Sequence, residues 1–552
     1  MLSRVDPVTQ GERTAAEIPI QENTLYVCPS PLYGYGLEIL LRRLPESSAL
    51  LCVEADPHLF AISYKALAGL PAQATSPAAV ALIEACRPEE VCVFARTTWG
   101  QRRFRAVQEV RLGGGWQLFP QLYESFAAAL RRELAVEWGN AMTMIRLGRL
   151  YAANLIRNVA SFSDAKTVAA LDFGSSPVLV LGAGHSLDAT LDELFRRFSS
   201  SGANCATRER RPFRIICVDT CLPALRERGI EPDLAVILES QHWNLNDFTG
   251  LRGWNIDAAI DLSALPASTR VLGGERFFFA TQWTKLALFS RLAQAGIVGE
   301  MLPPLGSVAL NAGELALRVT RGMVLTAGID FSYTVDSYHA RGTPGHRQRA
   351  RTQSRVKTLF SAAAAFREGT FPALSKNGRT VRSDPGMRTY CSLFQQQFGG
   401  QARLADIDGS GLPLGVKTVS PAEGFAILSG NAAVPQASGG TQRMLPAAAG
   451  DGSPCEREKI AAFARRELHA LDTLKQALTG EIPLEPADLG GLLLELDYLW
   501  AHFPEYAGTG GGREPAADVS FLKRVRTEID PFTNYWNMAL ESCTSHQPPL
   551  TP

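Results

Sequence analysis

Short polar sequences follow apolar runs at several points in the middle of the chain. The first is Gly182-Ala-Gly-His-Ser186, directly after the run Val178–Leu181 and before a helix-forming stretch that begins at Leu187. A turn of this kind presents backbone N–H groups and the positive end of a helix to an anion. The turn from Gly182 to Ser186 is therefore a candidate phosphate site, and a tight structural turn is the alternative interpretation.

The fingerprint of NAD-binding proteins is incomplete at this turn. Leu187 occupies the place of its third glycine, and Asp219, which ends the next apolar run, lies beyond the usual offset of about 20 residues. Both features argue against NAD.

Two more acidic residues follow apolar runs, Asp219 after Ile215–Val218 and Glu239 after Leu234–Leu238. Ligands of open parallel sheets bind outside the carboxyl ends of the strands, so these side chains are candidates for the same site. Asp219 would bind a ribose hydroxyl or a metal-bound water, and a helix cap is the alternative.

Further along, Gly306-Ser307 precedes the helical pattern Val308–Val319 and offers a second anion site. Asp330 follows the run Met323–Ala327, and His339 stands just before a basic segment that reaches Lys357. We expect His339, with His346 in reserve, to act as a general base beside charges that hold a phosphate or carboxylate. Each of these residues also has a plain structural interpretation as a cap, a turn residue or part of a solvated basic loop.

The alternation of apolar runs and helical patterns predicts the elements that carry these residues. Near-continuous apolar strands joined by helices indicate an α/β fold with a mostly parallel, Rossmann-like central sheet. A small N-terminal α/β domain and a helical C-terminal region accompany it. We expect an N-terminal domain over 1–115, linking helices over 116–165, a central nucleotide-binding domain over 166–425 and a helical domain over 455–545.

Within the N-terminal domain, strands are predicted at Thr24–Pro29, Ala49–Glu54 and Val91–Ala95. Its turn at Leu32–Gly36 resembles a degenerate dinucleotide-binding or adenosylmethionine-binding loop, with Glu54 placed as a ribose-binding acid would be, but a scaffolding role is favoured. By contrast, the stretch from Arg341 to Gly452 has no clear periodicity and is expected to form loops over a site, an insertion or a disordered region.

Composition narrows the classes of protein. Lys plus Arg (55) equals Asp plus Glu (55), so no global charge attracts nucleic acid or an anionic membrane. No two of the ten cysteines form a C-x-x-C pair, which argues against zinc and disulfide scaffolds. The sequence shows neither a signal peptide nor an apolar run long enough for a membrane span, and a cytoplasmic protein is expected.

The order of the motifs resembles the motility accessory factor family, which shares a domain with the archaeal 6-hydroxymethylpterin diphosphokinases. The resemblance rests on Val178–Asp188, Ile216–Thr220, Gly229–Asp233 with Val236–Glu239, and the later segments Gly306-Ser-Val, Gly328-Ile-Asp-Phe and Tyr338-His-Ala340. It spans roughly residues 138–415. The family usually has proline where this chain has His185, and aspartate where it has Glu239.

The resemblance implies a glycosyltransferase that moves a nonulosonic, sialic-acid-like sugar from a CMP donor to Ser or Thr hydroxyls of flagellin. Gly182, Gly184 and Ser186 would hold the nucleotide phosphate, Asp219 would line the nucleoside site, and Gly306 and Ser307 would close the other side. His339 and Asp330 are the expected catalytic residues.

Two other functions stay open. One is a diphosphokinase of a pterin-like alcohol that uses ATP and magnesium, with Asp219, Glu239 and Asp330 as metal ligands. The other is a flagellar accessory protein without catalysis, which binds flagellin through its outer domains.

Overall fold

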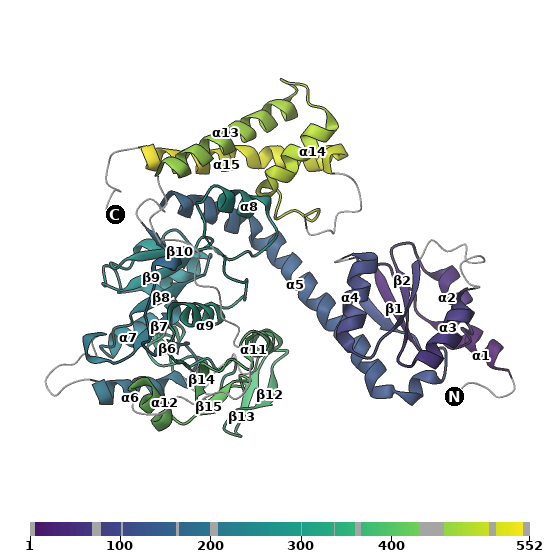
Figure 1. Cartoon of the computed structure of the whole chain (residues 1–552), viewed down its shortest axis with the longest axis horizontal. Coiled ribbons are helices and arrows are strands. Elements are labelled where there is room, and N and C mark those ends of the chain that lie inside the picture. The colour runs from purple at the N-terminus through teal and green to yellow at the C-terminus, as the bar shows by residue number, and fades with distance from the viewer. Residues whose placement is uncertain are drawn as a thin grey trace. The chain divides into compact units, whose positions relative to one another are not determined.

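A computed structural model of the chain describes residues 6–68, 79–100, 103–161, 165–198, 208–299, 301–335, 337–358, 366–430, 457–506 and 515–544 (Figure 1). The chain divides into two compact units. Unit 1 comprises Met1–Arg149 and Trp500–Val519, and unit 2 comprises Leu150–Leu499 and Ser520–Pro552. Cys205 and Cys455 lie outside the described residues, and the other eight cysteines are all free thiols.

Unit 1 is a four-stranded parallel sheet with the order β3-β2-β1-β4 and helices on both faces. Alternate residues of β1 and β2 point to opposite faces, where Leu25 and Leu51 enter one core and Tyr26 and Leu50 the other. The elements are β1 (Thr24–Pro29), β2 (Ala49–Glu54), β3 (Ala79–Glu84), β4 (Ala106–Glu109), α1 (Pro7–Glu17), α2 (Leu37–Arg43), α3 (Pro57–Ala68) and α4 (Pro88–Trp99).

The strand predicted at Val91–Ala95 is wrong, because this segment lies inside α4. Pro88 occupies the first turn and Glu90 closes a capping box, so the local signals start a helix at this point. Val91, Cys92 and Ala95 form its buried stripe, and the third strand lies earlier in the chain, at Ala79–Glu84. A short apolar run alone does not distinguish a strand from a buried helix face.

Glu54 is turned into the interior of unit 1. Its carboxylate accepts hydrogen bonds from the hydroxyls of Ser63 and Tyr123, and burial raises its pKa. This arrangement agrees with the scaffolding role.

Unit 2 contains a nine-stranded parallel sheet with the order β15-β14-β11-β6-β7-β8-β9-β10-β5, as the sequence predicted for the central fold (Figure 1). β6, β8 and β11 are buried along their whole length, which explains their continuous apolar sequences. The strands are β5 (Lys166–Thr167), β6 (Val178–Leu181), β7 (Arg214–Val218), β8 (Leu234–Ile237), β9 (Asp257–Asp261), β10 (Arg276–Phe279), β11 (Val324–Ala327), β14 (Leu404–Ile407) and β15 (Lys417–Val419).

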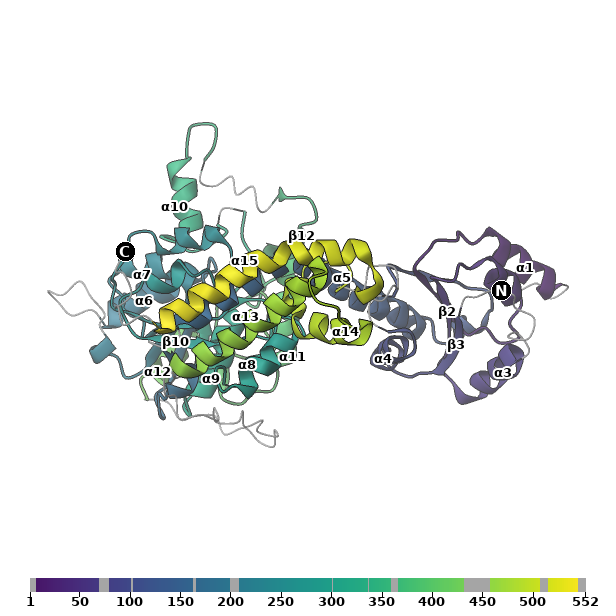
Figure 2. The same cartoon turned by 90° about the horizontal axis from the view of Figure 1, so that it is seen from above.

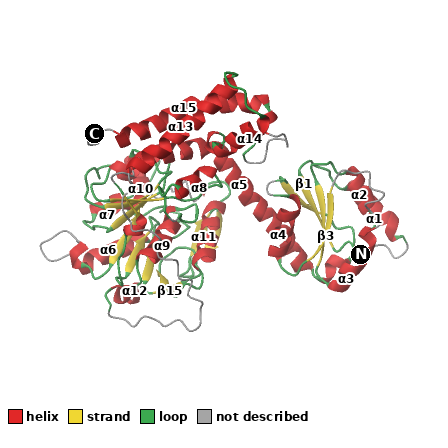
Figure 3. Ribbon diagram, turned by 45° about the horizontal axis from the view of Figure 1, so that its top comes forward, coloured by secondary structure: helices red, strands yellow, loops and turns green. Residues whose placement is uncertain are grey.

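The helix α9 (Val308–Val319) packs against β6, β7, β8 and β11 near the middle of this sheet. Other helices of unit 2 surround the sheet in the ribbon view of Figure 3: α6 (Leu187–Phe198), α7 (Leu222–Glu227), α8 (Ala287–Gln294), α10 (Pro344–Arg351), α11 (Pro385–Phe398) and α12 (Pro421–Leu428). The predicted helices Leu187–Phe198 and Val308–Val319 are confirmed to the residue.

The region from Arg341 to Gly452 is more regular than predicted, up to the end of its described part at residue 430. It contains α10, a hairpin of β12 (Phe371–Leu374) and β13 (Thr380–Ser383), α11, and the sheet strands β14 and β15. Each of these strands has only three or four residues, so no run was long enough to reveal a period.

A single helix, α5 (Pro120–Val159), forms most of the linking segment, for which one or two helices are predicted, and gives residues to both units. In unit 2, Asn154 and Asn158 of α5 donate hydrogen bonds to backbone carbonyls that follow β8 and β9. None of the described helices is long and apolar enough to cross a membrane.

The predicted C-terminal helices form a group beside α8 in unit 2 (Figure 2). They are α13 (Arg457–Thr479), α14 (Pro486–Glu495) and α15 (Val519–Thr544). A buried chain of hydrogen bonds runs from the indole of Trp536 to the hydroxyl of Tyr498 and from there to Glu467, which also pairs with Arg291 of α8. These polar contacts fix the helices to the sheet domain.

We predict that Gly328→Ala destabilises unit 2 by roughly 3 kcal/mol. Gly328 has a φ of +69°, and a Cβ atom there would lie 2.5 Å from the carbonyl oxygen of Gly182. The left-handed backbone costs about 1–2 kcal/mol for alanine, and forced repacking adds about 1–3 kcal/mol. Urea unfolding followed by circular dichroism measures the loss.

The matched control is Gly480→Ala, since Gly480 has a φ of +81° and nothing lies within 4 Å of its added Cβ atom. It should lose only the backbone cost. Equal losses of unfolding free energy in the two variants would show that the close approach of the backbones at Gly328 does not contribute to stability.

Candidate functional site

The central sheet changes direction of winding between β6 and β11. From β6 the chain continues through β7 and β8 on one side, whereas β11, β14 and β15 extend the sheet on the other. Ligands of open α/β sheets bind outside the carboxyl ends of the strands at such a point. A cavity of about 190 Å³ lies there, and Gly182, Gly184, Thr220, Ser307, Asp330 and His339 are among its lining residues.

The floor of the cavity consists of the two turns after β6 and β11, which lie against each other. A Cβ atom on Gly182 would lie 2.5 Å from the carbonyl oxygen of Gly328. The amide of Gly184 donates to that same carbonyl oxygen at 2.8 Å. Glycine is therefore required at these positions because the two backbones touch.

Asp330 ties the second turn to the start of α6. Its Oδ2 atom accepts a hydrogen bond from the amide of Ser186 at 2.8 Å, and its Oδ1 atom accepts one from the hydroxyl of Ser186 at 2.6 Å. A side chain of the protein thus occupies the helix end at which a phosphate was expected. The amides of Gly182 and Gly184 also donate to carbonyl oxygens, of Ala327 and Gly328, so the phosphate-binding role of this turn stays a prediction.

The start of α9 is the better anion site. Gly306, with a φ of +68°, turns the chain so that Ser307, Val308 and Ala309 line the cavity. The hydroxyl of Ser307 makes no capping bond, and in the described part of the chain the amides of Val308 and Ala309 donate to no protein acceptor. These groups and the positive helix end face the cavity.

Aromatic side chains form the walls of the cavity. Phe331 and Tyr333 come from the turn after β11, Tyr338 from the following segment, and Tyr390 from α11. Tyr338 and Tyr390 are largely buried, and this burial raises the pKa of each phenol. Such rings offer flat apolar faces for a base or a sugar ring, with hydroxyl groups at the edge.

His339 lies against the floor, where its backbone pairs with that of Gly184. Its Nδ1 atom is fully buried without a hydrogen-bond partner. Burial lowers the pKa of His339 to about 4, an effect increased by Arg349 and His185 and opposed by Asp330. The imidazole is therefore neutral at pH 7 and able to accept a proton.

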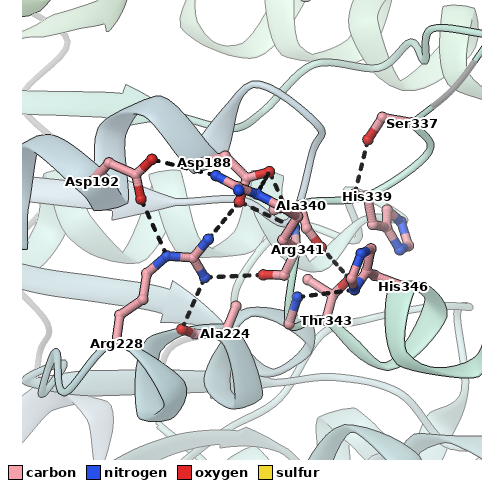
Figure 4. Close-up of polar contacts among 11 residues, drawn as sticks. Asp188, Asp192, Ala224, Arg228, Ser337, His339, Ala340, Arg341, Thr343 and His346 are labelled. Carbon is pink, nitrogen blue, oxygen red and sulfur yellow. Dashed lines mark hydrogen bonds and ion pairs between the residues drawn. The ribbon is translucent and has the colours of Figure 1, made fainter. Parts of the chain in front are cut away.

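His346, the reserve base, lies outside this cavity. It lines a groove beside α6 and α7, where its Nδ1 atom accepts a hydrogen bond of 3.3 Å from the amide of Gly342 (Figure 4). Of the two candidate histidines, the structure brings only His339 to the switch point.

Asp219 is buried and does not line the cavity. Its carboxylate accepts hydrogen bonds from the amide of Thr220 at 2.9 Å and from Asn244 at 2.7 Å. Burial, together with the nearby carboxylate of Asp247, raises the pKa of Asp219. Its neighbour Thr220 does line the cavity and donates to Asp247 at 3.1 Å, so Asp219 and Asp247 act on the site by orienting this hydroxyl.

Glu239 is exposed and accepts hydrogen bonds from the backbone and side chain of Gln241. It does not line the cavity, but its charge contributes to the raised pKa of Tyr390. Asp219, Glu239 and Asp330, the expected magnesium ligands, thus have separate sets of partners. In the described residues, no group of three or more His, Cys, Asp or Glu side chains is arranged to hold a metal ion.

Several residues of the site were not expected from the sequence. Tyr390, Asp247, Asn244 and Ser410 belong to segments with no recognisable motif. Ser410 lies 2.7 Å from the Nε2 atom of His185, whose Nδ1 atom lies 3.1 Å from Asp330. The unusual His185 therefore links the loop after β14 to the turn after β11.

The sequence is similar to known proteins in a way that agrees with this fold. Residues 153–336 match the family model described as 6-hydroxymethylpterin diphosphokinase MptE-like. The central domain of unit 2 is thus an MptE-like domain.

An uncharacterized protein of Treponema pallidum (strain Nichols) is 30% identical over 539 residues, which cover 94% of this chain and 89% of that protein. The structure of a MAf glycosyltransferase from Magnetospirillum magneticum AMB-1 covers 98% of this chain and 82% of its own, at 14% identity and a TM-score of 0.48. The chain belongs to the same family as the Treponema protein. Its central MptE-like domain is the shared domain that the order of the motifs predicted.

We predict that His339 makes the stability of unit 2 depend on pH. Its folded pKa of about 4 lies below the ordinary value of 6.5, so the stabilisation is complete above pH 6.5 and is lost as the pH falls toward 4. The full loss is about 3 kcal/mol. His339→Gln removes it, which thermal unfolding at a series of pH values would measure.

Because the raised pKa of Asp219 acts in the opposite direction in this range, the quantity to compare is the difference between variant and wild type at each pH. His469→Gln, which changes an exposed histidine of α13, is the control. A constant difference between His339→Gln and wild type from pH 7 to pH 4 would contradict the prediction.

Proposed function

We propose that unit 2 binds a nucleotide-activated sugar at the β6/β11 switch point and transfers the sugar to a hydroxyl group. One observation carries the proposal: the unpartnered N-terminus of α9 and the neutral imidazole of His339 line the same cavity. The first suits a phosphate that leaves as an anion, and the second suits an acceptor hydroxyl that must lose its proton.

In the proposed complex, the donor phosphate lies at Ser307, Val308 and Ala309, and the base lies against the rings of Tyr338 and Tyr390. The cavity of about 190 Å³ is smaller than the 300–1,000 Å³ usual for a ligand pocket. The sugar therefore extends toward the opening, where an acceptor can reach it.

Transfer then follows from the positions of these groups. The acceptor oxygen attacks the anomeric carbon while the bond from that carbon to the phosphate oxygen breaks, which inverts the configuration. His339 takes the hydroxyl proton, and the amides at the start of α9 stabilise the charge on the leaving phosphate. Asp330 is a positioning residue, since its carboxylate holds the start of α6.

The resemblance of the motifs to the motility accessory factors supports a more specific proposal. The donor would be a CMP-activated nonulosonic acid, and the acceptor would be a Ser or Thr hydroxyl of flagellin. The Magnetospirillum protein is named a glycosyltransferase, which is the class of reaction proposed for this chain.

The family model's name suggests a second candidate, a diphosphokinase that acts on a pterin alcohol. Its chemistry requires carboxylates that share a metal, whereas Asp219, Glu239 and Asp330 each bond to a different set of neighbours. Release of AMP from ATP and magnesium, without turnover of a CMP-sugar, would favour this candidate over sugar transfer.

We predict that Ser307→Asp weakens CMP binding about tenfold or more. Aspartate is as good an N-cap as serine, so α9 should keep its stability, while the added carboxylate repels the donor phosphate. Isothermal titration calorimetry with CMP and with cytidine measures the effect. Cytidine, which lacks the phosphate, should bind the variant and the wild type equally.

The control variant is Ser420→Asp, at the start of α12, where the serine hydroxyl accepts a bond from the amide of Glu423. It adds the same charge to a helix start that is not part of the cavity lining. If CMP bound to Ser307→Asp as tightly as to the control, the phosphate would not lie at α9.

We also predict that His339→Gln lowers kcat for transfer from a CMP-sugar to flagellin by about 10²–10⁴-fold, the usual contribution of a general base. The affinity for CMP should stay close to that of the wild type, because the imidazole contacts the acceptor. Single-turnover release of CMP measures the chemical step. A kcat equal to that of the His469→Gln control would remove His339 from the mechanism.

A further inference from the structure

An open groove of about 710 Å³ lies beside the cavity, on the surface formed by α6, α7 and α10. Its lining includes Asp192 of α6, Glu227 of α7, Arg228, and the residues Arg341, Arg347 and Arg351. A neighbouring hollow of about 520 Å³ shares Asp192, Glu227 and Arg228 and adds the partly exposed ring of Phe195. We call the two together the α10 groove.

Ion pairs build the wall of the α10 groove. Arg228 lies 2.8 Å from Asp188 and 3.5 Å from Asp192, and Arg341 contacts the same two carboxylates (Figure 4). Arg347 pairs with Glu227 at 2.6 Å. The first half of the basic segment is thus fixed to α6 and α7 and does not form the solvated loop of the alternative interpretation.

The second half of the segment keeps its positive charge. Residues 337–358 contain no Asp or Glu. Arg351, Arg355 and Lys357 are exposed, and in the described part of the chain none of the three pairs with a carboxylate. Figure 2 shows that α10, which ends at Arg351, stands out from the body of unit 2, and Arg351 lines the groove.

The same segment lines both the cavity and the groove. Tyr338 and His339 face the cavity, and Arg341, two residues later, faces the groove. In Figure 4, the imidazole of His339 and the guanidinium of Arg341 leave the chain toward different sides. Because His339 and Arg341 are only two residues apart, a chain held in the groove would lie close to the base that is proposed to activate the acceptor hydroxyl.

We propose that the α10 groove holds an acidic stretch of a polypeptide acceptor next to the transfer site. This inference rests on the proposed function, since it names the class of acceptor. The unpaired cations match an acidic sequence, and the hollow at Phe195 suits an apolar side chain. A nucleic acid fits less well, because it carries a phosphate at every residue and would meet the partly exposed carboxylates of Asp192 and Glu227, whereas a peptide can place its acidic residues at the unpaired cations alone.

The binding test uses a fluorescein-labelled ten-residue peptide of alternating Glu and Ser as the probe and the full-length protein. Arg351→Glu with Arg355→Glu should weaken binding at least about tenfold, and rising salt should weaken the wild type in parallel. Arg465→Glu with Arg526→Glu, two exposed positions on α13 and α15, is the control and should bind like the wild type. Equal binding by the two double variants, or displacement of the peptide by a ten-base-pair DNA duplex at lower concentration, would overturn the proposal.

A kinetic test separates this inference from the proposed function. With flagellin as acceptor, Arg351→Glu with Arg355→Glu should raise KM about tenfold or more and leave kcat and CMP affinity unchanged. A rise in KM of the same size with a small alcohol as acceptor would overturn the proposal. If the protein bound the acidic peptide through these residues but did not bind CMP, the result would support peptide binding in the α10 groove and contradict the proposed transferase function.

Discussion

The contact between the turn after β6 and the turn after β11 is the constraint on which the site of this protein depends. Two glycine backbones touch there, and the carboxylate of Asp330 receives two hydrogen bonds from Ser186 at the start of α6. These bonds hold together the two halves of a sheet whose winding reverses at this point. Because the backbones touch, the space above them has a rigid floor, and the cavity lining rises from it.

The same contact decides where an anion can bind. In many folds of this class the first glycine turn and its helix hold the phosphate. Here a side chain of the protein fills that place, and the free helix end belongs to α9, which starts at the edge of the cavity. The two helix starts therefore differ: Asp330 occupies the start of α6, whereas the first amides of α9 have no protein acceptor in the described part of the chain.

The charged groups around this site also fall into two classes, those with protein partners and those without. Asp219 and Asp247 do not line the cavity; burial raises the pKa of both, and both accept hydrogen bonds from Thr220. Arg228, Arg341 and Arg347 are matched by carboxylates of α6 and α7, which fixes the segment that carries His339. Only the exposed end of this segment keeps unpaired cations, so a chain with equal numbers of acidic and basic residues still has a local basic surface.

The sequence by itself determined the α/β class, the strands β6, β7, β8 and β11 and the helices α6 and α9, because strands buried on both faces and amphipathic helices leave continuous or periodic apolar patterns. The motifs at Gly182, Asp219, Ser307 and Asp330 were visible for the same reason, since each follows or precedes such a pattern. Val91–Ala95 was misread because a short apolar run also fits the buried face of a helix, and β14 and β15 were missed because they are too short to show a period. Only the tertiary structure decided the partners and the burial of each polar group. It paired Asp330 with Ser186, buried Asp219 outside the cavity lining, separated His339 from His346 and brought in Tyr390, because hydrogen-bond partners and burial depend on residues far apart in the chain.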